Sequence, residues 1–295
     1  MRADGPASPD TPATGRSARY VVRMIIRRRE SVYRFIVRTG QAVIRALRAD
    51  VRVEGLENLP PARPAGPVGA PRFRPVVPGT GAVVAITHSS LLDFVFAEWA
   101  IFRHHRVHMR FMIAKRYSGS RFMRAINGWC GHIVVDRANG AASFAEALGA
   151  VRRGDWVAMF PEGSRNLAVR PHALRTGAAR LAATTGAPIV PVAVFGGGRL
   201  LGGSEGLRVR RLWRAPVSLV VGEPLRVALD EDAHVATERL RAALGAALDR
   251  AVETFPAALP AGAPWVPADL GGGAPTVEEA QERWEQRRAE RELRG

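Results

Sequence analysis

The stretch AVVAITHSSLLDFVFAEWAIF, residues 82–102, decides the fold of this chain. Its first five residues, Ala82–Ile86, are an uninterrupted apolar run, which is typical of a buried β-strand. From residue 91 to residue 102 the apolar side chains recur at helical spacing instead. A buried strand followed closely by a helix is the unit from which parallel α/β sheets are built.

The same alternation continues on both sides of this unit. Further short strands are predicted at 51–58 (with a turn), 108–114, 132–135, 156–160, 188–195 and 217–221, and helices at 121–129, 141–153, 172–185 and 234–255. The pattern predicts an α/β fold, in which helices flank a mixed, mostly parallel sheet. We expect this domain to span residues 49–255.

The segments outside the sheet differ in composition. Residues 1–15 are polar, lack the apolar core of a signal peptide, and predict a disordered leader. Residues 59–80 hold seven prolines and predict a Pro-rich loop. Residues 256–295 predict a flexible tail, rich in Pro and Gly at first, that ends in a charged helix.

The charge of the chain points to an anionic partner. Lys and Arg number 43 against 27 Asp and Glu, a formal net charge of +16, which suits nucleic acid, anionic lipid or a phosphorylated substrate. The single cysteine, Cys130, excludes a disulfide framework and a multi-cysteine metal cluster, and we expect it to be a small buried residue. No uncharged apolar run reaches the ~18 residues of a membrane span.

Residues 16–48 concentrate this charge, with ten arginines against one acid, Glu30. Apolar residues recur among them at helical spacing: Val21, Ile25, Val32, Ile36, Val43 and Leu47. Gly40 leaves open whether one helix or two form. An apolar stripe beside an Arg-rich face predicts an amphipathic helical segment that binds an anionic membrane surface. The alternative is a helix docked on the domain with a solvated basic face.

His88 and Asp93 straddle the junction between the strand and the helix of the opening stretch. This spacing allows the carboxylate to turn back onto the imidazole, fix its tautomer, and leave the other ring nitrogen as a general base. A helix-capping or core role for these residues fits the spacing as well.

Polar side chains also follow three of the other predicted strands. Because the carboxyl ends of parallel strands meet at one edge of a sheet, we expect one rim to carry His88, Asp93, Lys115, Arg137, Glu162 and Arg165. Lys115 is the single lysine of the chain.

Four blocks of the sequence resemble the glycerolipid acyltransferases, the family of 1-acylglycerol-3-phosphate acyltransferases. HSSLLD (88–93) is similar to the HxxxxD block of that family. GHIVVDR (131–137), FPEGSRN (160–166) and IVPVAV (189–194) resemble its second, third and fourth blocks, in the family's order. The resemblance covers residues 50–225.

The resemblance implies a catalytic pair in which His88 deprotonates an acceptor hydroxyl and Asp93 orients His88. The hydroxyl then attacks an acyl thioester directly, with acyl-CoA or acyl carrier protein as donor and with no metal or bound cofactor. The substrate-binding residues implied for the acceptor's glycerol phosphate are Glu162, Gly163, Ser164 and Arg165, with Lys115 and Arg137 as further phosphate contacts.

The resemblance also implies a lysophospholipid acceptor, 1-acylglycerol 3-phosphate, and a peripheral enzyme on the cytoplasmic face of the cell membrane. Three residues depart from the family pattern: Thr87 stands in place of Asn, Ser164 in place of Thr, and Asn166 in place of Ser. Thr87 and the Pro-rich insertion leave other acceptors open: glycerol 3-phosphate, a lyso-ornithine lipid or another lyso-lipid.

Other classes of function have weaker support in the sequence. A basic nucleic-acid-binding protein fits the charge, but no nucleic-acid motif occurs, and we expect no nucleic-acid partner. Residues 202–206 match the GxSxG pattern of serine hydrolases without the strand that must precede it. His104, His105 and His108 cluster without neighbouring cysteine or carboxylate ligands, so no metal site is predicted.

Overall fold

The computed structural model describes residues 32–61, 79–200 and 209–292. Its strands are β1 (Asp50–Glu54), β2 (Ala82–Ile86), β3 (Met109–Ala114), β4 (Ile133–Val135), β5 (Trp156–Met159), β6 (Ile189–Phe195) and β7 (Pro216–Val221). Within the described residues these seven strands form one sheet in the order β1-β7-β6-β2-β5-β3-β4. Only the β6–β7 pair of this sheet is antiparallel. The prediction of a mixed, mostly parallel sheet is therefore confirmed.

Helices and short turns connect these strands. The α-helices are α2 (Asp93–His105), α3 (Arg121–Cys130), α4 (Gly140–Arg152), α5 (Gly177–Thr185), α6 (Gly197–Leu200), α7 (Ala233–Glu253) and α8 (Val277–Glu292), preceded by a helix at residues 32–46. The 3-10 turns are η1 (Leu56–Asn58), η2 (Lys115–Ser118), η3 (Arg137–Asn139), η4 (Val209–Leu212) and η5 (Ala268–Leu270).

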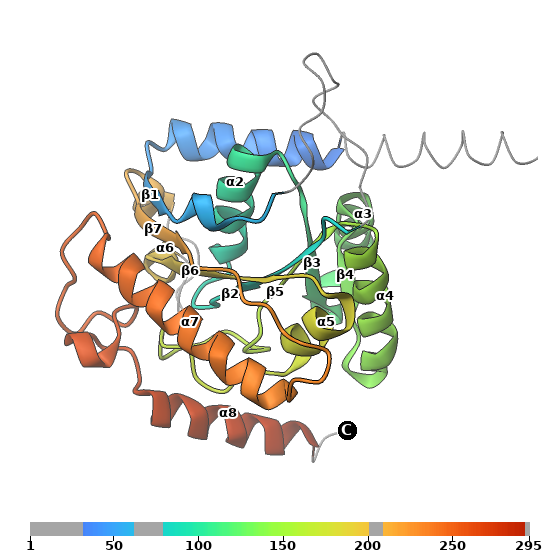
Figure 1. The fold of residues 1–295 in the computed structure, drawn as a ribbon. Coiled ribbons are helices and arrows are strands. Elements are labelled where there is room, and N and C mark those ends of the chain that lie inside the picture. The colour runs from blue at the N-terminus through green and yellow to red at the C-terminus, as the bar shows by residue number, and fades with distance from the viewer. Residues whose placement is uncertain (1–31, 62–78, 201–208, 293–295) are drawn as a thin grey trace, which may run out of the picture.

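Side chains of the central strands point alternately to the two faces of the sheet and pack into two separate hydrophobic cores. On β2, Val84 and Ile86 face α2 and the helix at residues 32–46, while Val83 and Ala85 face α4, α5 and α7. Figure 1 shows these two layers of helices on opposite sides of the sheet. Since both faces are covered, the strands read as continuous apolar runs rather than as alternating ones.

One helix begins later than its sequence pattern predicts. α5 starts at Gly177 instead of residue 172, because residues 161–176 form the long loop after β5. Pro171 disfavours helix in the residue before it, and the backbone N–H of Arg175 donates to the Pro161 carbonyl at 2.8 Å. This loop belongs to the site described below.

The helix at residues 32–46 runs through Gly40 without a break, so one helix forms there rather than two. Tyr33 and Val37 are buried against Phe102 of α2 and Cys130 of α3. Residues 1–31, which include the expected leader and the first half of the basic segment, lie outside the described residues. Among the helices that are described, none has the length and hydropathy needed to cross a bilayer.

The expectation of a flexible tail is wrong for residues 256–275. Trp265 packs on Phe195 and Phe255, with ring centroids 5.8 Å from each, and Val266 is fully buried. Arg170, in the loop after β5, also forms ion pairs with Asp249 of α7 and Asp269 of the tail. Apolar burial and these ion pairs therefore fix this Pro- and Gly-rich stretch to the domain.

Candidate active site

The loops after β2 and β5 are joined by two hydrogen bonds of the His88 backbone. β2 and β5 are parallel neighbours, so their carboxyl ends deliver His88 and Glu162 to the same edge of the sheet. The backbone N–H of His88 donates to Glu162 Oε1 at 3.2 Å, and the backbone N–H of Asn166 donates to the His88 carbonyl at 2.7 Å. The backbone of His88 is therefore held from both sides by the loop 161–176.

The side chain of His88 faces Asp93. Its Nδ1 lies 3.9 Å from Asp93 Oδ2, and its ring stacks on Phe160 with centroids 3.9 Å apart. The separation exceeds a hydrogen bond, as catalytic contacts often do before substrate is bound. Nδ1 is buried while 13% of the side chain is exposed, which leaves Nε2 as the nitrogen that can meet a substrate.

Asp93 opens α2 and is completely buried. Its Oδ2 accepts from the Ser90 backbone N–H at 2.7 Å and from Ser89 Oγ at 3.5 Å. Burial raises the pKa of this carboxyl, although these bonds and His88 oppose the shift. Oδ1 has no hydrogen-bond partner among the described residues and lies beside Gly197, the first residue of α6.

Glu162 is the second buried carboxyl of the site. Burial raises its pKa to about 8, so the neutral form predominates at pH 7. Its Oε2 has no hydrogen-bond partner in the described part of the chain and lies 4.0 Å from His172 Nδ1. A small cavity of about 10 Å³ lies between these groups, lined by Thr87, His88, Ser89, Glu162, Asn166, Val169, Pro171, Val194 and Leu248.

The turn after Glu162 carries the other predicted binding residues of β5. Gly163 has φ +69°, a left-handed conformation that favours glycine, and the Arg175 side chain packs against it. Ser164 and Arg165 are half-buried next to it. The turn thus presents a hydroxyl and a guanidinium at the same edge as His88.

Lys115 and Arg137 follow the next two strands, β3 and β4, at this edge. Lys115 Nζ lies 2.6 Å from Asp136 Oδ2, and this bond lowers the pKa of the Asp136 carboxyl. The lysine remains exposed. Arg137 begins η3, and its side chain is outside the described part of the chain.

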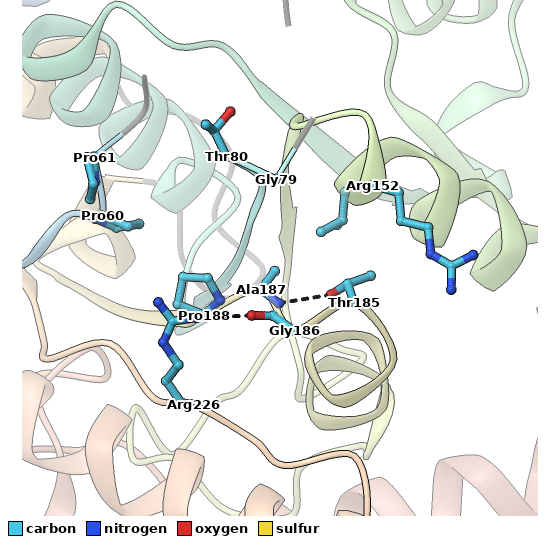
Figure 2. Close-up of a pocket in the computed structure, with 12 residues that line it drawn as sticks. Pro60, Pro61, Gly79, Thr80, Arg152, Thr185, Gly186, Ala187, Pro188 and Arg226 are labelled. Carbon is cyan, nitrogen blue, oxygen red and sulfur yellow. Dashed lines mark hydrogen bonds between the residues drawn. The ribbon is translucent and has the colours of Figure 1, made fainter. Parts of the chain in front are cut away.

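A larger cavity lies at the opposite edge of the sheet (Figure 2). It measures about 260 Å³ and is lined by residues that precede β2, β5 and β6, including Gly81, Arg152, Ala187 and Pro188. Ligands of such sheets bind beyond the carboxyl ends of the strands. The chemistry of the described residues is therefore at the His88 edge, away from this cavity.

Comparison with known proteins agrees with this geometry. A family model for acyltransferases matches residues 50–195, from β1 to the end of β6. The 1-acyl-sn-glycerol-3-phosphate acyltransferase of the alga Chlamydomonas reinhardtii is 29% identical over 158 residues. The part of the chain from β1 to β6 is therefore similar to the acyltransferase family.

The extent of the acyltransferase match differs between the two proteins compared. The algal alignment covers 51% of this chain and 40% of its relative. The crystal structure of the 1-acyl-sn-glycerophosphate acyltransferase PlsC from Thermotoga maritima superposes with a TM-score of 0.56, at 18% identity, over 77% of this chain and 81% of that one. At 18% identity this likeness shows that the two chains share a fold.

The structure adds four residues to the candidate site that the sequence did not single out for it. Phe160 stacks on His88, Asn166 bonds its backbone, Asp136 pairs with Lys115, and Gly197 lies against Asp93. Phe160, Asn166 and Asp136 sit inside the blocks that carry the resemblance, a signal that was available. Gly197 lies beyond the fourth block and carried none.

Proposed function

We propose that this acyltransferase moves a fatty acyl group from acyl-CoA or acyl carrier protein to the free hydroxyl of 1-acylglycerol 3-phosphate, which makes phosphatidate. The observation that carries the proposal is the pairing of His88 Nδ1 with the buried carboxylate of Asp93, 3.9 Å away. This pairing occupies Nδ1, so we assign the other imidazole nitrogen, Nε2, as the base.

The reaction needs one proton relay. His88 Nε2 takes the proton of the acceptor hydroxyl as its oxygen attacks the thioester carbonyl carbon. Asp93 stabilises the imidazolium that forms, as the aspartate does in hydrolase triads. The carbon–sulfur bond then breaks, and the leaving thiolate takes the proton back from His88.

Direct attack fits the surroundings of His88. Ser89 Oγ is bonded to Asp93 and not to the imidazole. Cys130 is buried in another cluster, and burial raises the pKa of its thiol to about 11, so no thiolate is available at neutral pH. We therefore assign no acyl-enzyme intermediate, and the proposed chemistry uses no metal or bound cofactor.

The acceptor's glycerol phosphate would bind along the same edge. The planar guanidinium of Arg165 can donate two hydrogen bonds to a phosphate, and Lys115, after the neighbouring strand β3, offers a point charge. Neutral Glu162 can donate a hydrogen bond to the acceptor, and Gly163 and Ser164 shape the turn that contacts it. Arg137, which follows the neighbouring strand β4, is the further phosphate contact that we propose.

The acceptor is a membrane lipid, so the enzyme must reach a bilayer. We propose peripheral attachment to the cytoplasmic face of the cell membrane through the basic segment 16–48. In support, the helix at residues 32–46 exposes Phe35, Ile36 and Val43 beside its arginines. Apolar and cationic side chains together suit the headgroup region of an anionic bilayer.

The test is an acyl-transfer assay of the purified full chain with labelled acyl-CoA or acyl carrier protein. The acceptors are 1-acylglycerol 3-phosphate, glycerol 3-phosphate and lyso-ornithine lipid. We expect the first to give the highest kcat/KM. His88→Ala should lower kcat by about 10²–10⁴, the usual contribution of a general base.

The matched control is His234→Ala, since His234 is exposed on α7, away from the sheet edge that carries His88. It should leave both turnover and the unfolding temperature unchanged. Near-normal rates in a folded His88→Ala protein would exclude the mechanism. A higher kcat/KM on another acceptor would replace 1-acylglycerol 3-phosphate in the proposal.

A further inference from the structure

Helix α3 and the preceding turn η2 form an exposed basic segment. Residues 115–135 hold four cationic side chains close in sequence to aromatic residues, Lys115, Arg116, Arg121 and Arg124, and contain no Asp or Glu. Along α3, Phe122, Ile126 and Trp129 recur at four- and three-residue spacing, which puts them on one face of the helix. The arginines occupy the neighbouring positions.

Most of this helix does not pack on the domain. Phe122 is 70% exposed, Trp129 48% and Met123 37%, and both α3 arginines are exposed. Large apolar side chains gathered at such exposure on one short helix mark a binding surface rather than scattered surface residues.

The position of α3 links the site to the N-terminal helix. Ser120 caps α3 directly after β3 and η2, so the first turn of α3 lies at the sheet edge that carries His88. At its other end, Ile126 and Cys130 pack on Tyr33 and Val37 of the helix at residues 32–46. Figure 1 shows α3 next to the start of that helix.

We propose that α3 and η2 form a second membrane-contacting surface, which binds an anionic bilayer beside the active-site edge. Phe122, Met123 and Trp129 enter the headgroup region, and Arg121 and Arg124 contact lipid phosphates. Tyr117 belongs to the same surface: it is 42% exposed, and the Arg116 guanidinium lies 4.8 Å from its ring centroid. Only the purpose of this contact, access to a lipid acceptor, rests on the proposed function.

The combination of cationic and aromatic side chains on α3 and η2 indicates which partner binds there. An acidic protein partner, such as acyl carrier protein, also complements the arginines. A bilayer fits better because it accommodates large apolar side chains along the whole helix while its phosphates pair with the flanking cations. The helix at residues 32–46, against which α3 packs, also exposes apolar side chains, Phe35 and Val43.

The experiment is co-sedimentation of the full chain with vesicles of phosphatidylcholine and phosphatidylglycerol, at low and high salt. Phe122→Ser/Trp129→Ser should weaken binding by roughly tenfold or more, through lost apolar burial. Arg121→Ala and Arg124→Ala should each weaken it by about fivefold at low salt and less at high salt. Leu229→Ser/Val235→Ser is the matched control, because both residues are exposed at or near the start of α7 on the opposite face of the sheet.

Equal sedimentation of the Phe122→Ser/Trp129→Ser protein and the unchanged chain would overturn the proposal. A second result would also overturn it: variants that sediment with vesicles as the unchanged chain does but bind acyl carrier protein more weakly in a separate titration. The surface would then be a docking site for the carrier protein. Turnover of a short-chain, water-soluble acceptor is measured in parallel and should be unchanged in these variants. If the unchanged chain transfers no acyl group, the proposed function fails while the vesicle result still stands.

Discussion

Gly197 lies against the carboxylate of Asp93: a Cβ atom at position 197 would come within 2.5 Å of Asp93 Oδ1 and 3.0 Å of Ser90 Cβ. Gly197 follows the end of β6, whereas Asp93 opens α2 after β2, the neighbouring strand. Oδ1 has no hydrogen-bond partner among the described residues. The absence of a side chain at Gly197 therefore sets the space in which the carboxylate of Asp93 sits.

Gly197→Ala should displace Asp93 and lower kcat without a comparable change in either KM. A misplacement near 1 Å costs on the order of 10²-fold in rate, so we expect a loss of about 10- to 100-fold. Steady-state kinetics and the unfolding temperature are the measurements. Gly245→Ala on α7 is the control, since a Cβ there meets nothing within 4 Å. If Gly197→Ala lowers the unfolding temperature and leaves kcat intact, Gly197 only supports the fold.

The strands could be predicted from the sequence because each central strand is a short apolar run bounded by turn residues. The sheet buries these runs on both faces, so the hydrophobic signal is continuous and strong. The approach of Asp93 to His88 was also predictable, since both residues lie in one strand–helix junction and only local geometry brings them together.

The surroundings of the pair depend on strand order, which local patterns do not specify. Gly197 meets Asp93, and Asn166 meets His88, because β6 and β5 flank β2. Lys115 is a second example of a contact that local sequence patterns do not specify. The sequence predicts it as a phosphate contact, but its partner in the structure, Asp136, lies 21 positions away, directly after β4.

The Lys115–Asp136 pair predicts opposite effects of two substitutions. Lys115→Ala should raise the KM for the acceptor by roughly tenfold, because a charged hydrogen bond to phosphate is lost. Asp136→Asn should lower that KM, because it removes the carboxylate that competes with phosphate for the ammonium. The KM for the thioester should change in neither variant. An increase of the acceptor KM in both variants would show that the pair is structural.

The helix at residues 32–46 has an exposed face and a face buried against the domain. We expect the exposed face to bind membranes without any change in the buried face. Deleting it would remove Tyr33, whose hydroxyl donates to the Met109 carbonyl at 2.8 Å, and would disturb the core. Phe35→Ser/Val43→Ser leaves that contact in place, since both residues are exposed. We expect weaker sedimentation with anionic vesicles and an unchanged circular dichroism spectrum. Undiminished sedimentation would mean that the exposed face of this helix is only solvated.

The raised pKa of Glu162 predicts a pH-dependent stability. Burial raises the pKa of its carboxyl from 4.5 to about 8 in the folded chain, so the neutral form stabilises the fold fully below pH 4.5. This contribution is lost as the pH rises toward 8, because the unfolded chain releases the proton first, at about 1.4 kcal/mol per unit of pKa difference. The free energy of unfolding, measured in urea at pH 5, 6, 7 and 8, should therefore fall with pH. Glu162→Gln should make this decline shallower, whereas Glu57→Gln, at an exposed position, should not alter it. The same slope in Glu162→Gln as in the unchanged chain would mean that the folded protein holds Glu162 ionised.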